Sequence, residues 1–357
     1  MNIQEATRRY ETWLAEHIRV IRSDLQVKHE LMARDPFSFF RATFYRWMQL
    51  YPAICPKASS APRVLAVGDL HVENYGTWRD AEGRLVWGIN DFDESFTLPY
   101  TIDLVRLAAS ATLAIKLNHL RFAPASACTA LLEGYSEALA TGGEPFVLSE
   151  KHAWLREAVT GRERDPVMFW QKFAALPSIK PPPRVSALLK DAMPKRDLKF
   201  RVVHRRAGLG SLGRERFTAI AYSDGGNLAR EAKALLPSAC VWAGTARDSR
   251  IYYAQMLQQI VRAADPFMSM RSGWILRRLA PYCSRIELQQ LPRGPYAEKL
   301  LRAMGKELAN VHFGTRKAIP SVRRDLRSRG PKWLQHASTA MVDATLKDWN
   351  EWRKSPA

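Results

Sequence analysis

The chain has 357 residues, 46% hydrophobic and 25% charged, a globular balance with room for about two domains. Lys and Arg number 54 against 35 Asp and Glu, so the formal net charge is +19, which favours anionic partners such as nucleotides, nucleic acid or acidic membrane surfaces. The four cysteines form no C-x-x-C pair, which argues against a structural zinc site and a disulfide framework, and no apolar segment is both long and uncharged enough to span a bilayer.

The first elements in chain order are predicted to be helices. An amphipathic pattern predicts one long helix over residues 3–33, which Asp35-Pro36 ends. Pro36 suits the first turn of a second helix, over about residues 36–50, whose aromatic stripe is typical of a core face. Prolines predict a loop over residues 52–62. The N-terminus has no apolar signal-peptide core, so a cytoplasmic location is expected.

Two short apolar runs follow, at residues 64–67 and 85–89, and each ends at Gly or Asn. Such runs are typical of buried strands that stop at a loop. We expect these two strands to deliver Asp69 and Asp91 to the same edge of one small sheet. Residues 80–83 have turn chemistry, which favours a hairpin between them.

The segments after these runs carry oxygen-bearing side chains. Asp69, Asn74 and Asp91 supply hard oxygen ligands and one candidate base, which is what a magnesium–phosphate site needs. Asp93 is a further candidate ligand or a turn-capping residue. Because Asp and Asn are common at strand ends, ordinary turn residues are the alternative interpretation.

Helices are predicted over residues 101–118 and about 123–140, and Asp103 and Arg106 are expected to pair on one helix face. The triple proline within Lys180–Arg184 makes that segment the best linker in the chain. Beyond the linker the residue pattern becomes more strand-like, and strands are predicted at 199–204, 217–222, 274–279 and 285–288. Helices are predicted at 250–264 and 295–313, followed by a basic, helical segment that extends to Trp352.

A Gly-x-Gly-x-x-Gly loop, with Gly208, Gly210, Ser211 and Gly213, lies between the first two of these strands. In a dinucleotide-binding unit such a loop opens a helix, whereas in a kinase-type unit it bends between two antiparallel strands and covers phosphates. The strand at 217–222 favours the kinase-type loop, and a plain glycine turn is the alternative.

The Asp69, Asn74 and Asp91 spacing resembles protein-kinase-like phosphotransferases of the aminoglycoside and choline kinase style. The resemblance implies that Asp69 accepts a proton from an attacking hydroxyl and that Asn74 and Asp91 hold magnesium against nucleotide phosphates. His71 is interpreted as a structural brace. In an ordinary kinase the glycine loop comes first, so the resemblance implies a circular permutation.

The expected fold class is α+β, a permuted two-lobed kinase-like fold. Residues 1–184 are expected to form the larger, mostly helical lobe with the catalytic and metal loops. Residues 199–290 are expected to form a small β-rich nucleotide lobe with an antiparallel sheet, and residues 291–357 helices that return to the larger lobe.

Several segments together carry a second resemblance: residues 35–41, 68–76, 90–94, 103–107, 208–213 and 230–232. By these segments the chain resembles the bacterial family called domain of unknown function 2252. The family pattern usually has Lys-Glu-Ala after the glycine loop, whereas this chain has Arg230-Glu231-Ala232, so either Arg230 or Lys233 is expected to contact phosphate.

The resulting expectation is a phosphotransferase that uses ATP and Mg²⁺ on an unknown hydroxyl-bearing small-molecule or protein acceptor. Three alternatives stay open: a catalytically weak ATP-binding or nucleotidyl-transferring protein, a metallophosphoesterase that uses the Asp-x-His shape at Asp69, and a noncatalytic basic module for nucleic acid. No nucleic-acid motif supports the last alternative.

Overall fold

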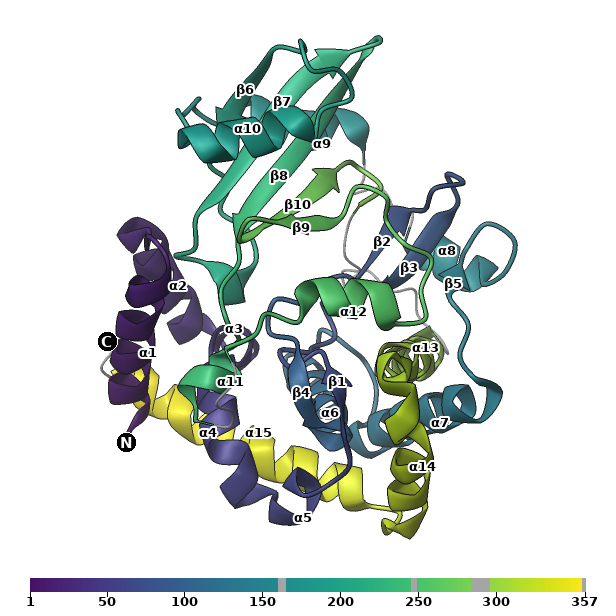
Figure 1. Cartoon of the computed structure of the whole chain (residues 1–357). Coiled ribbons are helices and arrows are strands. Elements are labelled where there is room, and N and C mark those ends of the chain that lie inside the picture. The colour runs from purple at the N-terminus through teal and green to yellow at the C-terminus, as the bar shows by residue number, and fades with distance from the viewer. Residues whose placement is uncertain (160–164, 245–248, 284–295, 355–357) are drawn as a thin grey trace.

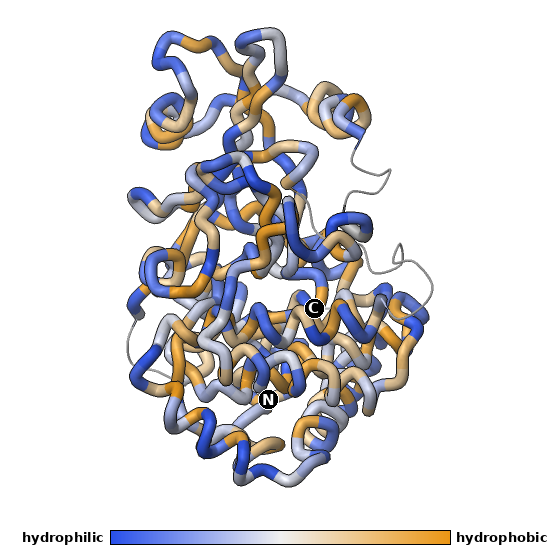
Figure 2. Tube along the Cα trace, turned by 90° about the vertical axis from the view of Figure 1, so that its right-hand side faces the viewer, coloured by the Kyte–Doolittle hydropathy of each residue, from blue (hydrophilic) through white to orange (hydrophobic). Residues whose placement is uncertain are grey.

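The computed structural model describes residues 1–159, 165–244, 249–283 and 296–354 and shows an α+β fold with antiparallel sheets. Figure 1 shows one twisted sheet standing above a helical body that contains two smaller sheets. Figure 2 gives the same arrangement from a direction turned by 90°. None of the described helices combines the length and apolar character needed to cross a bilayer.

The upper sheet has five strands, and one face of it is covered by α10 (Pro183–Asp191). Val185 and Leu189 of α10 pack on the sheet, so Pro183 and Arg184 of the predicted linker open a helix. Predictions of strands near 199–204, 217–222 and 274–279 are confirmed. The strand order is β6 (Phe200–Val203), β7 (Arg216–Ser223), β8 (Gly226–Ala234), β10 (Trp274–Leu279) and β9 (Ser269–Arg271).

The two smaller sheets correct the prediction that strands 64–67 and 85–89 form one hairpin. In the structure β1 (Arg63–Ala66) pairs with β4 (Phe96–Pro99), while β3 (Leu85–Ile89) pairs with β2 (Tyr75–Arg79) and β5 (Phe146–Val147). The predicted turn is real, but it joins β2 to β3. The prediction did not include β2, a short strand that begins directly after Asn74 and takes the place of β1 beside β3.

The helical body is held together by α6 (Tyr100–Lys116), α7 (Pro124–Thr141) and α13 (Tyr296–His312), which confirms three predicted helices. Glycines let α7 and α13 touch closely: a Cβ on Gly134 would lie 1.9 Å from the carbonyl oxygen of Arg302. Other described helices are α8 (Ala153–Val159), α9 (Pro166–Ala174), α11 (Ala239–Trp242), α12 (Tyr253–Gln259), α14 (Ile319–Ser328) and α15 (Trp333–Lys354), with 3₁₀ turns at Leu209–Ser211 and Phe313–Ala318.

The predicted helix over residues 3–33 is two helices, α1 (Ile3–His17) and α2 (Arg22–Arg34). The chain is extended at Ile18, and the Ile21 N–H donates to the Gly213 carbonyl oxygen at 2.9 Å. A long-range hydrogen bond to the glycine loop therefore overrides helical periodicity among β-branched residues, which are weak helix formers.

The second predicted helix, over residues 36–50, is also two helices, α3 (Pro36–Ala42) and α4 (Phe44–Ile54). The Asp35 side chain accepts the Ser38 N–H at 2.7 Å, which caps α3 as the Asp-Pro pair predicts. The predicted loop over 52–62 is largely wrong, because α4 runs past Pro52 and α5 (Pro56–Ser59) follows it. The predicted strand at 285–288 lies outside the described residues.

Candidate functional site

A cleft of about 1030 Å³ is lined by residues of both the five-stranded sheet and the helical body. Most of the sequence-predicted site residues line it, although more than a hundred residues separate the acidic segments from the glycine loop. Gly213 and Arg230 are predicted site residues that do not line the cleft. Those that do are Asp69, Asn74, Asp91, Asp93, Gly208, Gly210, Ser211 and Lys233.

The loop after β1 is positioned by a buried carboxylate on α6. Asp103 accepts the N–H of Val67 at 2.7 Å and the N–H of Gly68 at 2.9 Å, and the His312 ring lies 3.0 Å from the same carboxylate. The predicted pairing of Asp103 with Arg106 is therefore wrong. Asp103 is engaged by backbone N–H groups and His312, and it fixes the direction in which Asp69 leaves the strand.

Asp69 itself pairs with the fully buried Arg106, whose Nε donates to Asp69 Oδ1 at 3.1 Å. The other oxygen, Oδ2, lies beside the glycine loop: a Cβ on Gly210 would be 3.2 Å from it and 2.9 Å from the Arg41 carbonyl oxygen. Burial raises the pKa of Asp69 despite the opposing charge of Arg106. Glycine at position 210 thus lets the loop approach a basic carboxylate oxygen.

Asn74 ties the two acidic segments together. Its Oδ1 accepts the His71 N–H at 2.6 Å, and its carbonyl oxygen accepts the Asn90 N–H at 3.1 Å. The His71 Nδ1 in turn accepts the Glu73 N–H at 3.2 Å, in agreement with a bracing role for His71. Because the amide oxygen of Asn74 already caps this turn, its role as a metal ligand stays a prediction.

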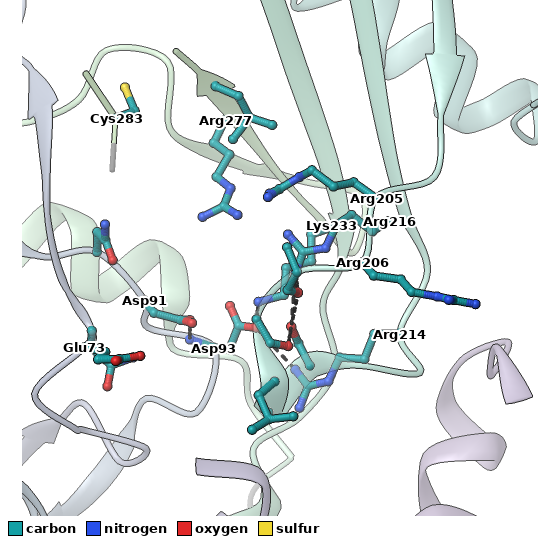
Figure 3. A pocket seen from close by; sticks show the side chains of 18 of the residues that line it. Glu73, Asp91, Asp93, Arg205, Arg206, Arg214, Arg216, Lys233, Arg277 and Cys283 are labelled. Carbon is teal, nitrogen blue, oxygen red and sulfur yellow. Dashed lines mark hydrogen bonds and ion pairs between the residues drawn. The ribbon is translucent and has the colours of Figure 1, made fainter. Parts of the chain in front are cut away.

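Asp91 and Asp93 follow β3 and face the sheet across the cleft (Figure 3). Asp93 forms an ion pair with Lys233 and lies 3.4 Å from Arg214. Burial opposes ionisation of Asp91, but the charges of Lys233 and Arg277 lower its pKa. Burial and the neighbouring Asp91 charge raise the pKa of Asp93.

The donor set of this acidic pair suits a hard cation. Within the described ranges, no group of three or more His, Cys, Asp or Glu side chains is arranged to hold a metal ion. Magnesium is commonly bound by one or two carboxylates together with substrate phosphates. Asp91 and Asp93 therefore fit a magnesium ion that is bound jointly with a phosphate-bearing ligand.

Strand geometry separates the two candidate phosphate contacts on β8, Arg230 and Lys233. Being three residues apart on a strand, they point to opposite faces of the sheet. Arg230 stacks on Phe267 and donates to the Ala192 carbonyl oxygen at 3.0 Å. Lys233 lines the cleft and pairs with Asp93. Of these two residues, only Lys233 is placed to reach a ligand in the cleft.

Sequence reasoning missed the residues that join the sheet to the body. Arg214, directly after the glycine loop, is buried and donates to Glu94 Oε1 at 2.7 Å. The other oxygen of Glu94 accepts the Ala239 N–H at 2.7 Å. Glu94 lies in the predicted segment 90–94, and Arg214 directly follows Gly213 of the glycine loop. Their closeness in sequence to these motifs was the signal that could have identified them.

A second buried carboxylate, on α13, holds the end of β3 from which Asp91 follows. Glu307 of α13 accepts the Ile89 N–H at 3.2 Å and the Asn310 side-chain N–H at 2.9 Å. Burial raises the pKa of Glu307 to about 7. The end of β3, from which Asp91 emerges, is thus held by a group that titrates near neutral pH.

The raised pKa of Glu307 predicts a pH-dependent stability. Between the usual glutamate pKa and about 7 the folded chain binds this proton more tightly than the unfolded chain, so the free energy of unfolding should fall as pH rises. The expected fall is about 3 kcal/mol, complete above about pH 7. Urea denaturation of the parent and of Glu307→Gln across this range checks it, with the exposed Glu133→Gln as control. Identical pH profiles for parent and Glu307→Gln would contradict it.

Comparison with known proteins finds a family model that matches part of the chain. A family model described as an uncharacterized protein conserved in bacteria, domain of unknown function 2252, matches residues 19–166. The matched region contains both acidic segments and ends before the glycine loop. No curated protein and no solved structure matches the chain.

Proposed function

We propose that the protein is an ATP- and magnesium-dependent phosphotransferase with a permuted kinase-like arrangement, which acts on a hydroxyl-bearing acceptor. The observation that carries this proposal is the shared cleft, which is lined by Asp69, Asp91 and Asp93 from the helical body and by the glycine loop and Lys233 from the sheet. Figure 3 shows Asp91, Asp93 and Lys233 at this site. Opposite charges in one cleft suit a ligand made of phosphates and a cation.

In this proposal the sheet binds the nucleotide phosphates. The glycine loop bends between β6 and β7, and Gly208 has φ +74°, a backbone conformation that favours glycine. Lys233 contributes a compact positive charge next to this loop. Its present partner, Asp93, would be shared with the ligand's cation, because both Asp91 and Asp93 face the same space.

The segments that carry Asp69 and the Asp91–Asp93 pair would perform the phosphate transfer. Magnesium, when bound with the nucleotide, would neutralise charge on the transferring phosphate. Asp91 and Asp93 would hold that ion. Asp69 would orient the acceptor hydroxyl and accept its proton through Oδ2, the oxygen that is not engaged by Arg106. Arg106 keeps the Asp69 carboxylate in a fixed orientation, as catalytic positioning requires.

The test is thermal denaturation with ATP and magnesium. At about 100 times the dissociation constant the ligand stabilises the folded chain by about 2.7 kcal/mol, which should raise Tm by roughly 5 °C. Asp91→Asn should lose most of this shift. The control Asp343→Asn, on an exposed position of α15, should keep it.

Two results would count against the function. One is a parent protein whose Tm does not respond to ATP with magnesium. The other is an Asp91→Asn variant that responds as the parent does. A Tm shift that persists without any detectable phosphate transfer or release would instead identify a binding protein that uses the same cleft.

A further inference from the structure

One buried glutamate on the cleft side of the sheet is surrounded by three arginines. Glu231 of β8 is 0% exposed. Its carboxylate lies 2.6 Å from Arg216, 2.6 Å from Arg277 and 2.7 Å from Arg205. Three guanidinium charges against one carboxylate leave two positive charges in excess.

The sheet builds this arrangement from three neighbouring segments. Glu231 pairs in register with Thr218 of β7 and with Arg277 of β10, so β8 carries the carboxylate between its two neighbours. Arg216 reaches it from β7, and Arg205 from the chain just beyond β6. Burial would raise the pKa of Glu231, but the three guanidinium groups lower it well below the usual range, so the carboxylate stays charged and keeps them gathered.

A single arginine would suffice to neutralise Glu231, so the other two leave positive charge and hydrogen-bond donors at the cleft. All three arginines line it, and the side chains of Arg205 and Arg277 are each 27% exposed. Both use Nε and Nη2 on Glu231. Across the part of the chain that the structure describes, their Nη1 groups have no hydrogen-bond partner. These donors are open to a ligand.

The cluster also lies between the glycine loop and the metal loop. The Arg216 Nη2 donates to Ser211 Oγ at 3.0 Å and to the Ala207 carbonyl oxygen at 2.9 Å. Arg277 and Asp91 line the same cleft. Figure 3 shows the guanidinium group of Arg277 directed into the space that Asp91 faces.

We propose that Arg205 and Arg277 form a preassembled phosphate-binding site, with Glu231 as the residue that orients them and Arg216 as a buried positive charge that joins them to the glycine loop. Guanidinium groups bind phosphate oxygens through paired N–H bonds, and prior assembly removes the cost of ordering two long side chains. The ligand is a phosphoryl group, carried either by the nucleotide or by an already phosphorylated acceptor. The inference deepens the proposed function and rests on it only for the choice between these two carriers.

The first test measures binding of inorganic tripolyphosphate to the full chain by calorimetry. Arg277→Gln and Arg205→Gln should each weaken binding at least about tenfold, because each removes charged hydrogen bonds to phosphate. The control Arg184→Gln, on an exposed position of α10, should bind as the parent does. Unchanged binding in both cleft variants, or no binding to the parent, would overturn the inference.

Folding of the variants is checked by their ligand-free melting curves. Each keeps two arginines on Glu231, so the core of the cluster stays paired. Should Arg277→Gln fail to fold, Arg205→Gln gives the same test from a segment outside the strands.

The second test identifies the carrier. Competition between magnesium–ATP and tripolyphosphate would assign the site to the nucleotide's phosphates, whereas undiminished tripolyphosphate binding to protein saturated with a nonhydrolysable ATP analogue would assign it to the acceptor. The two proposals fail separately. Arginine-dependent tripolyphosphate binding without any ATP binding rejects the phosphotransferase and keeps this site, whereas magnesium–ATP binding by the parent together with tripolyphosphate binding that ignores both arginine variants does the reverse.

Discussion

Asp69→Asn is expected to lower magnesium-dependent ATP turnover, with water or an acceptor as the attacking group, by about 10²- to 10⁴-fold. An asparagine oxygen can still accept from Arg106, so the loop should keep its shape, but the side chain no longer accepts a proton. Nucleotide affinity should change little, because in this proposal Lys233 and the ion held by Asp91 and Asp93 bind the phosphates, whereas Asp69 binds the acceptor hydroxyl. Phosphate release under saturating ATP measures the effect.

The control for Asp69 is again Asp343→Asn, which makes the same chemical change on an exposed helix. It should turn over ATP at the parent's rate. An Asp69→Asn variant with parental turnover and an intact fold would remove Asp69 from the chemistry. Reduced affinity at parental turnover would instead give Asp69 a role in holding the nucleotide.

Arg106→Met is expected to reduce the free energy of unfolding by about 3 kcal/mol, because it leaves the Asp69 carboxylate, whose side chain is only 20% exposed, without its counter-charge. Arg106 is 1% exposed, its Nη2 donates to the Phe40 carbonyl oxygen at 3.0 Å, and its guanidinium lies 4.1 Å from the Phe40 ring centroid. Methionine restores part of the packing but neither hydrogen bonds nor charge. Urea denaturation at neutral pH measures the loss.

Two comparisons separate this effect from a general loss of an arginine. Arg302→Met removes an exposed ion pair with Glu137 and should cost less than about 1 kcal/mol. The double variant Asp69→Asn, Arg106→Met should be less destabilised than Arg106→Met alone, since no unpaired carboxylate charge is left at this partly buried position. Additive losses would show that Asp69 and Arg106 do not depend on each other.

The sequence predicted those elements that local patterns determine. Helices α6, α7 and α13 are long and regular, and the glycine loop stands between two strands with clear β-branched and aromatic composition. It did not predict the break at Ile18, since that break depends on a hydrogen bond to Gly213, almost two hundred residues away. It also did not predict which strands pair, because pairing is a property of the folded chain.

The candidate site shows the same division. Asp69, Asp91 and the glycines were visible because they interrupt apolar runs, and the structure brings them to one cleft. The choice between Arg230 and Lys233 needed the knowledge that β8 is a strand, since only then do the two side chains point apart. The arginines around Glu231 were not recognisable, because three separate segments supply them.

The contacts of Arg214 and Lys233 with Glu94 and Asp93 have a consequence for behaviour in concentrated salt. All four side chains are less than 10% exposed, so dissolved ions screen these attractions far less than they screen surface pairs. Raising the ionic strength should therefore leave the contacts between the sheet and the helical body intact, while it weakens the binding of any anionic ligand that enters the cleft from bulk solvent. Salt in the buffer would then lower the fraction of protein with ligand in the cleft without changing the fold.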